Sequence, residues 1–381
     1  MESRSLTKLM SFTLSLVVLH LPLSLLSAQT PYTQAGDADQ SWTATTESQT
    51  ANTNPTRTTE SHSQSGNRTV DNQSVERLGP NGHYEPYLDT EKESVQVTPT
   101  TTRTVVRTFG RDGSGQKILT QVTEEERQSL PGGNEKLVRL TSDSNLDGRL
   151  QVVRREIAET KKTSPDVQET KTTVFLSDGS RGLVPSMQIQ ERQKTGSDHT
   201  INLQKSTLLL DGAGNWQVNE LKESTIKENG KERTTDERIS RPGSDGKLVV
   251  VSSSLSKESE IASGEKRNTV EIYSTDIPGS TPDGKLHLSQ RVTTLNRSRA
   301  DGGKQTEQQI EQPNPGDPNS GLGVTIKTVD IAQPGPSGIR ETRTIQVQDS
   351  AGSFGVVSVD NTKSDKRRPV TVDISPPSKP K

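Results

Sequence analysis

The apolar residues of this chain recur in a short pattern that begins at a glycine. Side chains two residues apart lie on the same face of a strand, so Gly-x-apolar-x-apolar predicts a strand that leaves a turn with one apolar face. We expect these apolar residues to share one face and to be the best-buried side chains of their strands. The pattern follows Gly148, Gly214, Gly246, Gly284 and Gly352, and its first apolar residues are Leu150, Trp216, Leu248, Leu286 and Phe354.

Turn signals recur at a steady distance along the chain. Asp-Gly and Asn-Gly pairs permit the positive φ of tight hairpin turns, and a second series of turn signals, such as Asn229-Gly230, falls between the Asp-Gly pairs. This regularity predicts a repeat of about 34 residues, a two-strand hairpin, with the six Asp-Gly turns of the first series at the same end. Gly148, Gly246 and Gly284 are expected at positive φ. The series is Asp112, Asp147, Asp178, Asp211, Asp245 and Asp283.

The predicted fold is all-β, an elongated antiparallel β-meander of about 16 strands built from these hairpin repeats. Helix is disfavoured because helical periodicity is poor and β-branched residues are frequent. A four-bladed propeller fits less well, because the repeat contains two strands rather than the four of a blade. A transmembrane barrel is disfavoured because only 3% of residues are aromatic and the chain ends in the polar segment 375–381. The mature chain is therefore expected not to span a membrane.

Composition limits the core and several functions. Only 26% of the residues are hydrophobic and the mean hydropathy is −0.81, so a thick core along the whole chain is excluded. The net charge of −2 comes from interspersed basic and acidic residues, which gives no basic face for nucleic acid. The absence of cysteine excludes disulfides, thiolate metal sites and a thioether lipid anchor.

Four regions follow from the composition. Residues 1–28 are predicted to form a signal peptide, with Arg4 and Lys8 before an apolar stretch and Ala28 before the expected new N-terminus, Gln29. The segment 29–94, rich in Ser, Thr, Gln and Asn, is predicted to be a disordered linker. The β-hairpin repeat region is assigned to 95–360, and a polar tail with proline and lysine to 361–381. The protein is expected to be exported, to the periplasm or beyond the cell.

The best-defined candidate for a site is a weak calcium loop. Asp143, Asn145 and Asp147, followed by Gly148, match the opening of the loop in which alternate oxygen ligands converge on one cation. Arg154 stands at the twelfth position, where a bidentate glutamate is required. A plain hairpin turn is therefore the favoured interpretation, and no metal or other cofactor is predicted.

Other chemistry has no support in the spacing of residues. The five histidines are not placed as metal ligands, no G-x-S-x-G elbow is present, and Trp216 fits packing better than sugar stacking. The leading hypothesis is an exported, non-enzymatic structural or interaction protein. The sequence identifies no partner, and polymers or proteins of the cell envelope or exterior are the candidates. The alternative is an exported module that binds a polysaccharide, peptidoglycan or a calcium-dependent ligand, and an exported hydrolase comes third.

Overall fold

The computed structural model describes residues 41–364, except for 180–181, 263, 277–282, 315–316, 336–337 and 350. The predicted signal peptide (1–28), with the expected new N-terminus at Gln29, and the tail from residue 365 on lie outside the described residues. No helix in the described part of the chain is long and apolar enough to cross a membrane.

Twenty strands and one short 3-10 helix account for almost all of the described residues. The strands have between 10 and 19 residues. They are β1 Ser41–Thr50, β2 Thr56–Ser65, β3 Arg68–Leu78, β4 Tyr84–Thr98, β5 Thr101–Arg111, β6 Lys117–Leu130, η1 Pro131–Gly133, β7 Asn134–Ser144, β8 Leu150–Ser164, β9 Val167–Ser177, β10 Leu183–Thr195, β11 Ile201–Leu210, β12 Trp216–Asn229, β13 Glu232–Pro242, β14 Leu248–Ala262, β15 Glu265–Ser274, β16 His287–Ser298, β17 Lys304–Asn314, β18 Asp317–Gly335, β19 Gly338–Gln348 and β20 Phe354–Ser364.

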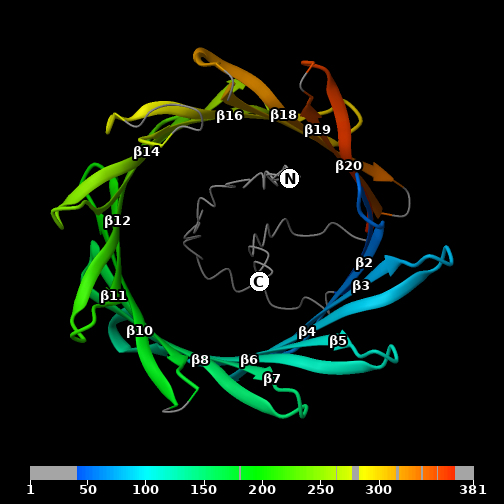
Figure 1. The fold of residues 1–381 in the computed structure, drawn as a ribbon, viewed down its shortest axis with the longest axis horizontal. Helices are drawn as coiled ribbons and strands as arrows, with labels where there is room; N and C mark the ends of the chain where they lie inside the picture. The colour runs from blue at the N-terminus through cyan, green and yellow to red at the C-terminus, as the bar shows by residue number, and fades with distance from the viewer. Residues whose placement is uncertain are drawn as a thin grey trace, which may run out of the picture. The chain divides into compact units, whose positions relative to one another are not determined.

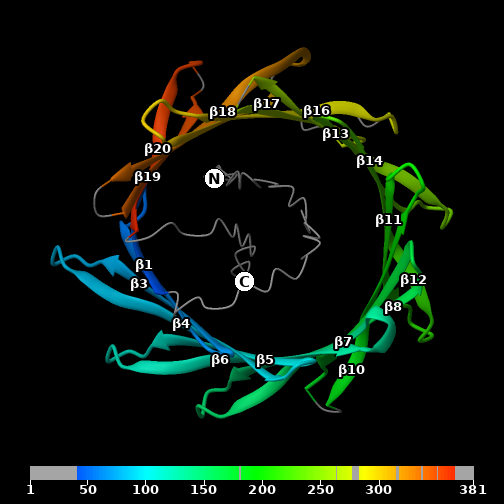
Figure 2. The same ribbon diagram turned by 180° about the vertical axis from the view of Figure 1, so that it is seen from behind.

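The strands close into a barrel (Figures 1 and 2). Each strand pairs antiparallel with its neighbours in sequence, and β1 pairs with β20 over Ala44–Thr50 and Ser358–Ser364. Two hydroxyl pairs support this seam: Thr46 Oγ1 lies 2.8 Å from Thr362 Oγ1, and Thr50 Oγ1 lies 3.1 Å from Ser358 Oγ. Closure satisfies the backbone N–H and C=O groups that an open edge would leave unpaired.

Closure corrects two predictions. The fold is the predicted all-β antiparallel meander of hairpins, but it is a closed ring of 20 strands rather than an elongated meander of about 16. The prediction that the mature chain does not span a membrane is also wrong: it was based on the few aromatic residues and the polar segment 375–381, and neither prevents the ring from closing. A closed barrel is the form in which β-strands cross membranes, since it leaves no unsatisfied edge in lipid.

The region predicted as a linker, 29–94, supplies β1 to β3 and most of β4. It lacks apolar alternation, but its polar side chains pair across strands instead. Arg57 Nε donates to Glu76 Oε2 at 2.6 Å, and Gln73 Nε2 donates to Glu60 Oε1 at 3.1 Å. Threonine is also β-branched and suits a strand. Described strands are therefore present from Ser41 on, well before residue 95, and β20 extends past the predicted boundary at 360.

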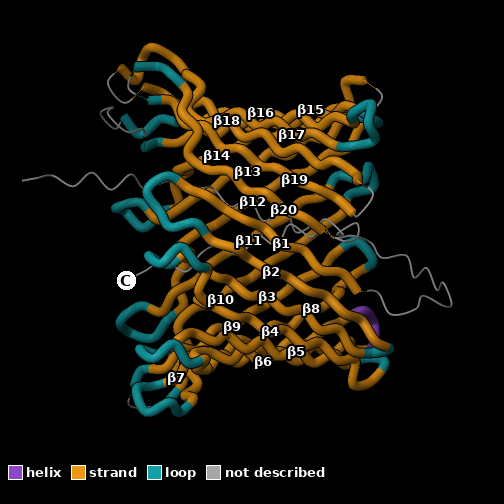
Figure 3. Tube along the Cα trace, turned by 90° about the vertical axis from the view of Figure 1, so that its right-hand side faces the viewer, coloured by secondary structure: helices purple, strands orange, loops and turns teal. Residues whose placement is uncertain are grey.

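The six Asp-Gly turns of the predicted series, which does not include Asp301-Gly302 between β16 and β17, all lie at one end of the barrel, as predicted. They connect odd-numbered strands to the even-numbered strands that follow, from β5–β6 to β15–β16. Successive antiparallel strands return every second turn to the same end, and Figure 3 shows these larger turns together on one side. We call this the Asp-Gly end.

The wall is thin, and nearly every even-numbered strand has a β-bulge close to the Asp-Gly end. In β12, for example, Val218 pairs with Leu208 of β11 and Glu220 pairs with Thr207, so one extra residue of β12 stands between the two pairs. A bulge adds a residue and bends its strand, and in Figure 1 the hairpins flare outward at this end. No large side chain in the described ranges is fully buried. Backbone hydrogen bonds between strands, rather than a packed apolar core, therefore hold most of the fold together.

Many of the tips share one geometry that requires a positive φ at the fourth of five residues. Asn145 N donates to Arg149 O, and Gly148, with φ 74°, donates to Asn145 O. The tip at Gly196 has the same two bonds, but its fourth residue is His199, with φ 63°. Gly148, Gly246 and Gly284 have positive φ, which confirms the prediction.

We expect Gly148→Val to lower the free energy of unfolding by more than about 1 kcal/mol, because a β-branched side chain is strained at positive φ. His199→Gly should raise it by up to about 1 kcal/mol for the same reason. Urea unfolding followed by far-UV circular dichroism measures both changes. Two effects of the same sign would contradict the shared tip geometry.

Candidate functional site

Side chains at the hairpin tips are engaged in holding the turns. Asp112 Oδ1 accepts hydrogen bonds from Ser114 N and Gln116 N at 2.8 and 2.9 Å. Asp211 Oδ1 does the same with Ala213 N and Asn215 N. The Ser114 hydroxyl is the main cause that holds the pKa of Asp112 below its usual value, and the Asn215 N–H is the main cause for the pKa of Asp211. The tips are thus built to favour the ionised carboxylate.

These tip carboxylates predict an acid-sensitive end. A depressed folded pKa means that the stabilisation is present above the ordinary aspartate pKa of 3.8 and is lost as pH falls through the lower folded value. Asn145 makes the same two bonds with an amide that does not titrate. We therefore expect Asp112→Asn/Asp211→Asn to show a flatter loss of stability with acid than the unmodified protein, measured as urea midpoints across that range. An unchanged acid limb would contradict the assignment.

The calcium-loop candidates are not brought together around a cation site. Asn145 Oδ1 is occupied by Asp147 N and Arg149 N, and Asp143 Oδ1 accepts from Gln121 Nε2 at 2.9 Å. Arg154, at the twelfth position of the motif, forms an ion pair with Glu156. Across the described ranges, no group of His, Asp and Glu is placed to hold a metal ion.

We expect calcium to bind at this turn weakly or not at all, because its oxygens already serve the hairpin and a bidentate carboxylate is missing. Isothermal titration of the mature protein with calcium chloride measures this directly. Saturable binding at micromolar calcium that is lost in Asp143→Asn would contradict it.

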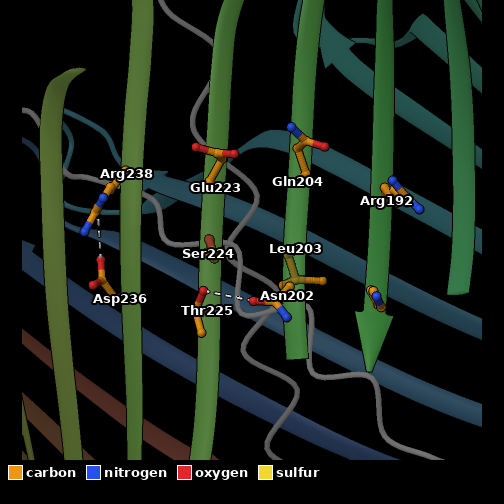
Figure 4. A pocket seen from close by; sticks show the side chains of 10 residues that line it. Arg192, Asn202, Leu203, Gln204, Glu223, Ser224, Thr225, Asp236 and Arg238 are labelled. Atoms are coloured by element: carbon orange, nitrogen blue, oxygen red, sulfur yellow. Dashed lines mark hydrogen bonds and ion pairs between the residues drawn. The ribbon is translucent and has the colours of Figure 1, made fainter. Parts of the chain in front are cut away.

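The two faces of the wall follow from strand register and from Figure 4. The figure views β10 to β13 from outside the barrel, with the opposite wall behind, and Arg192, Gln204 and Glu223 stand on the outer side. Leu203 and Ser224 alternate with them and face the lumen. The register of every strand pair extends this assignment round the ring.

A shallow groove of about 510 Å³ crosses the outer wall over β10 to β13. It is polar: Thr225 Oγ1 donates to Asn202 Oδ1 at 3.1 Å, and Arg238 pairs with Asp236 at 3.8 Å (Figure 4). A second groove continues it over β8 to β11, and both share Arg192 and Gln204. Charged side chains of both signs thus cover the outer wall away from the Asp-Gly end.

The lumen wall carries charges that are paired across strands. Arg139 donates to Glu125 at 2.6 Å and to Glu156 at 3.1 Å, and all three face the lumen. Lys222 Nζ lies 2.8 Å from Glu237 Oε2, which also accepts from Ser224 Oγ at 3.1 Å. The side chain of Glu237 is only 8% exposed. Such pairing makes the inner wall polar without leaving buried charges unsatisfied.

Next to the seam, a row of aromatic and charged side chains crosses the lumen face of β1 to β4. Trp42 stacks on His62, with ring centroids 5.7 Å apart and an interplanar angle of 9°. His62 Nδ1 lies 2.6 Å from Asp71 Oδ1, and Lys92 lies 3.9 Å from the other oxygen of Asp71. These residues fall in the segment predicted to be the linker, and no local pattern in the sequence signals that they lie side by side.

The apolar residues that follow the turns point outward, not into a core. Leu208 and Leu210 lie on the same outer face of β11 as Gln204, and they pair with Val218 and Trp216 of β12. The prediction that these residues share one face is confirmed for the four that lie in strands, because Leu150, Trp216, Leu248 and Phe354 all face outward, whereas Leu286 precedes β16. The prediction that they are the best-buried side chains of their strands is wrong, since Leu150 is 44% exposed and Leu248 is 42% exposed.

Together these residues form an apolar collar on the outer wall near the Asp-Gly end, contributed by most strands of the ring. The bulges extend it, because the extra residue in β12 places Leu221 on the same outer face as Trp216 and Val218. We define the outer collar as Leu78, Tyr84, Phe109, Leu119, Leu150, Val152, Phe175, Leu208, Leu210, Trp216, Val218, Leu221, Leu248, Val250, Tyr273, Leu288, Val324, Phe354 and Val356.

Comparison with known proteins assigns no family to this chain. No family model matches the chain, and no curated protein matches it by sequence. Among solved structures, the siderophore receptor PirA from Pseudomonas aeruginosa is similar, with 8% identity, a TM-score of 0.45, and coverage of 87% of this chain and 81% of that one.

Two other similar structures are OccK5 (OpdH) from the same organism and the FrpB iron transporter from Neisseria meningitidis. OccK5 has 9% identity and a TM-score of 0.43, and the match covers 86% of this chain and 96% of that one. FrpB has 8% identity and a TM-score of 0.38, with coverage of 86% and 74%. With TM-scores below 0.5, the barrel assignment rests on this chain's own strand pairing.

Proposed function

We propose that this protein is an exported, non-enzymatic barrel of the cell envelope that spans the outer membrane and encloses an aqueous passage. The observation that carries the proposal is the closed ring whose inner wall is lined by paired charges and hydroxyl groups. A polar inner wall favours water and polar solutes inside the ring, and closure allows the ring to lie in lipid without exposed backbone groups. The signal-like segment at the N-terminus supports export.

The alternative of a sugar-binding module centred on Trp216 has less support. A sugar platform needs polar partners beside the ring, whereas Trp216 pairs with Leu210 in the outer collar. The polar outer groove over β10 to β13 is open and lies between exposed ion pairs, which are worth little individually. The lumen therefore remains the better candidate for the functional surface.

Planar-bilayer recording with the purified mature protein tests the proposal. We expect stepwise, ohmic conductance. The absence of native cysteine allows a matched control on one strand: Thr172 faces the lumen and Thr173 faces outward in β9. A charged thiosulfonate reagent should change the conductance of Thr172→Cys and leave that of Thr173→Cys unchanged. No conductance with membrane-inserted protein, or the same response in both variants, would overturn the proposal.

A further inference from the structure

We propose that the outer collar is the part of this barrel that contacts the acyl chains of the membrane, and that the barrel prefers a thin bilayer. This inference rests on the proposed function. The collar presents exposed leucine and valine side chains, such as Leu150, Leu248 and Val250, to the surroundings of the barrel. Exposed apolar surface of this extent on an exported protein marks a contact with lipid or with another protein.

The geometry of the collar favours lipid as its occupant. The apolar side chains are contributed by strands from β3 round to β20, so they look outward in all directions around the ring. A single bound protein covers one side of a cylinder, whereas acyl chains surround it. Aromatic side chains, among them Tyr84, Phe109 and Phe354, lie within the collar, and aromatic residues favour the boundary between hydrocarbon and headgroups.

Two lysines at the collar have the arrangement expected at such a boundary. Lys117 Nζ lies 4.0 Å from the centroid of the Phe109 ring and approaches it from the side of the hairpin tips. Lys327 Nζ lies 3.9 Å from the centroid of the Phe354 ring and approaches from the other side of the collar. A lysine in this position lays its aliphatic stem along apolar surface and keeps its ammonium group at the headgroup level.

The height of the collar sets the thickness of bilayer that it fits. Outward positions on one strand are two residues apart, which is about 6.7 Å along the strand and roughly 5 Å along a barrel axis at the usual tilt. Two to three apolar rows therefore give a band of roughly 10–15 Å, compared with about 25 Å in outer-membrane barrels and about 30 Å for a hydrocarbon core. Beyond the collar the outer wall is charged, with Arg192, Glu223 and Arg238. A short band requires a thin or locally thinned bilayer.

The two tryptophans of the chain provide a matched test. Trp216 lies in the collar on the outer face, and Trp42 faces the lumen. Trp42→Phe leaves Trp216 as the only tryptophan, and Trp216→Phe leaves Trp42. In vesicles of phosphatidylcholine brominated on its acyl chains, we expect Trp42→Phe to lose most of its tryptophan fluorescence and Trp216→Phe to lose little.

Flotation of the same vesicles separates the two proposals. Protein that does not float with vesicles contradicts the proposed membrane function itself. Protein that floats, but whose Trp216 is quenched no more than Trp42, contradicts the collar as the site of lipid contact. We also expect a higher inserted yield in dilauroylphosphatidylcholine than in the thicker dierucoylphosphatidylcholine, and an equal or reversed yield would overturn the inferred preference for a thin bilayer.

Discussion

A disulfide between Thr46→Cys and Thr362→Cys should form readily on oxidation and lock the barrel closed. The two residues are direct partners across the β1–β20 seam, with their hydroxyl oxygens 2.8 Å apart. Directly opposed residues in an antiparallel pair have Cα atoms about 4.5–5.5 Å apart, which is within the range of a disulfide. The chain has no native cysteine to compete.

The expected effect of this disulfide is large because the partners are 316 residues apart in sequence. On the loop-entropy model, closing so long a loop raises the free energy of unfolding by about 6 kcal/mol. Non-reducing gel electrophoresis detects the cross-link as a change in mobility of the denatured chain, and urea unfolding with and without reductant measures the stabilisation.

The control for the seam keeps Thr46→Cys and moves the second cysteine to Thr328, which faces the lumen on β18. Three strand spacings, about 14 Å, separate β18 from β1 along the wall, which is too far for a disulfide. Cross-linking in both variants to the same extent would indicate a collapsed or mobile chain. Failure of the seam pair alone would mean that the ring is open.

Removal of the Lys222 ammonium group from the lumen wall should destabilise the barrel strongly. Lys222 and Glu237 form an ion pair at 2.8 Å, with side chains 18% and 8% exposed. Lys222→Met leaves the Glu237 carboxylate shielded from water with only the Ser224 hydroxyl as its partner. An uncompensated charge of this kind costs about 3 kcal/mol.

A second ion pair on the same wall provides the control. Lys205 and Glu191 are 2.9 Å apart but 40% and 46% exposed, so Lys205→Met should cost less than about 1 kcal/mol. The double variant Lys222→Met/Glu237→Leu should recover most of the loss, because it removes the unpaired charge. Urea midpoints by circular dichroism measure all three variants. Equal losses in Lys222→Met and Lys205→Met would contradict the role of burial.

Local signals in the sequence were enough to predict the hairpin architecture of this protein. Asp-Gly turns at a regular distance specify hairpins because positive φ is a property of a few adjacent residues. That local chemistry was sufficient to place Asp147 and Asp245 at the same end and to assign positive φ to Gly148. It also placed Trp216 and Leu248 on one face, because side chains in a strand alternate with a period of two residues.

The number of paired strands, the closure of the sheet and the direction of each face depend on contacts between distant segments. Closure requires β1 to meet β20, a pairing without any local signal, and β1 lies in a polar segment whose hydroxyl pairs replace apolar packing. The alternation of apolar and polar residues along a strand shows that the two faces of the sheet differ, but it does not show which face is on the convex, outer side. The bulges shift that alternation by one residue within a strand. The curvature of the closed ring therefore turned the expected core residues, Leu150 and Trp216 among them, into an outer collar.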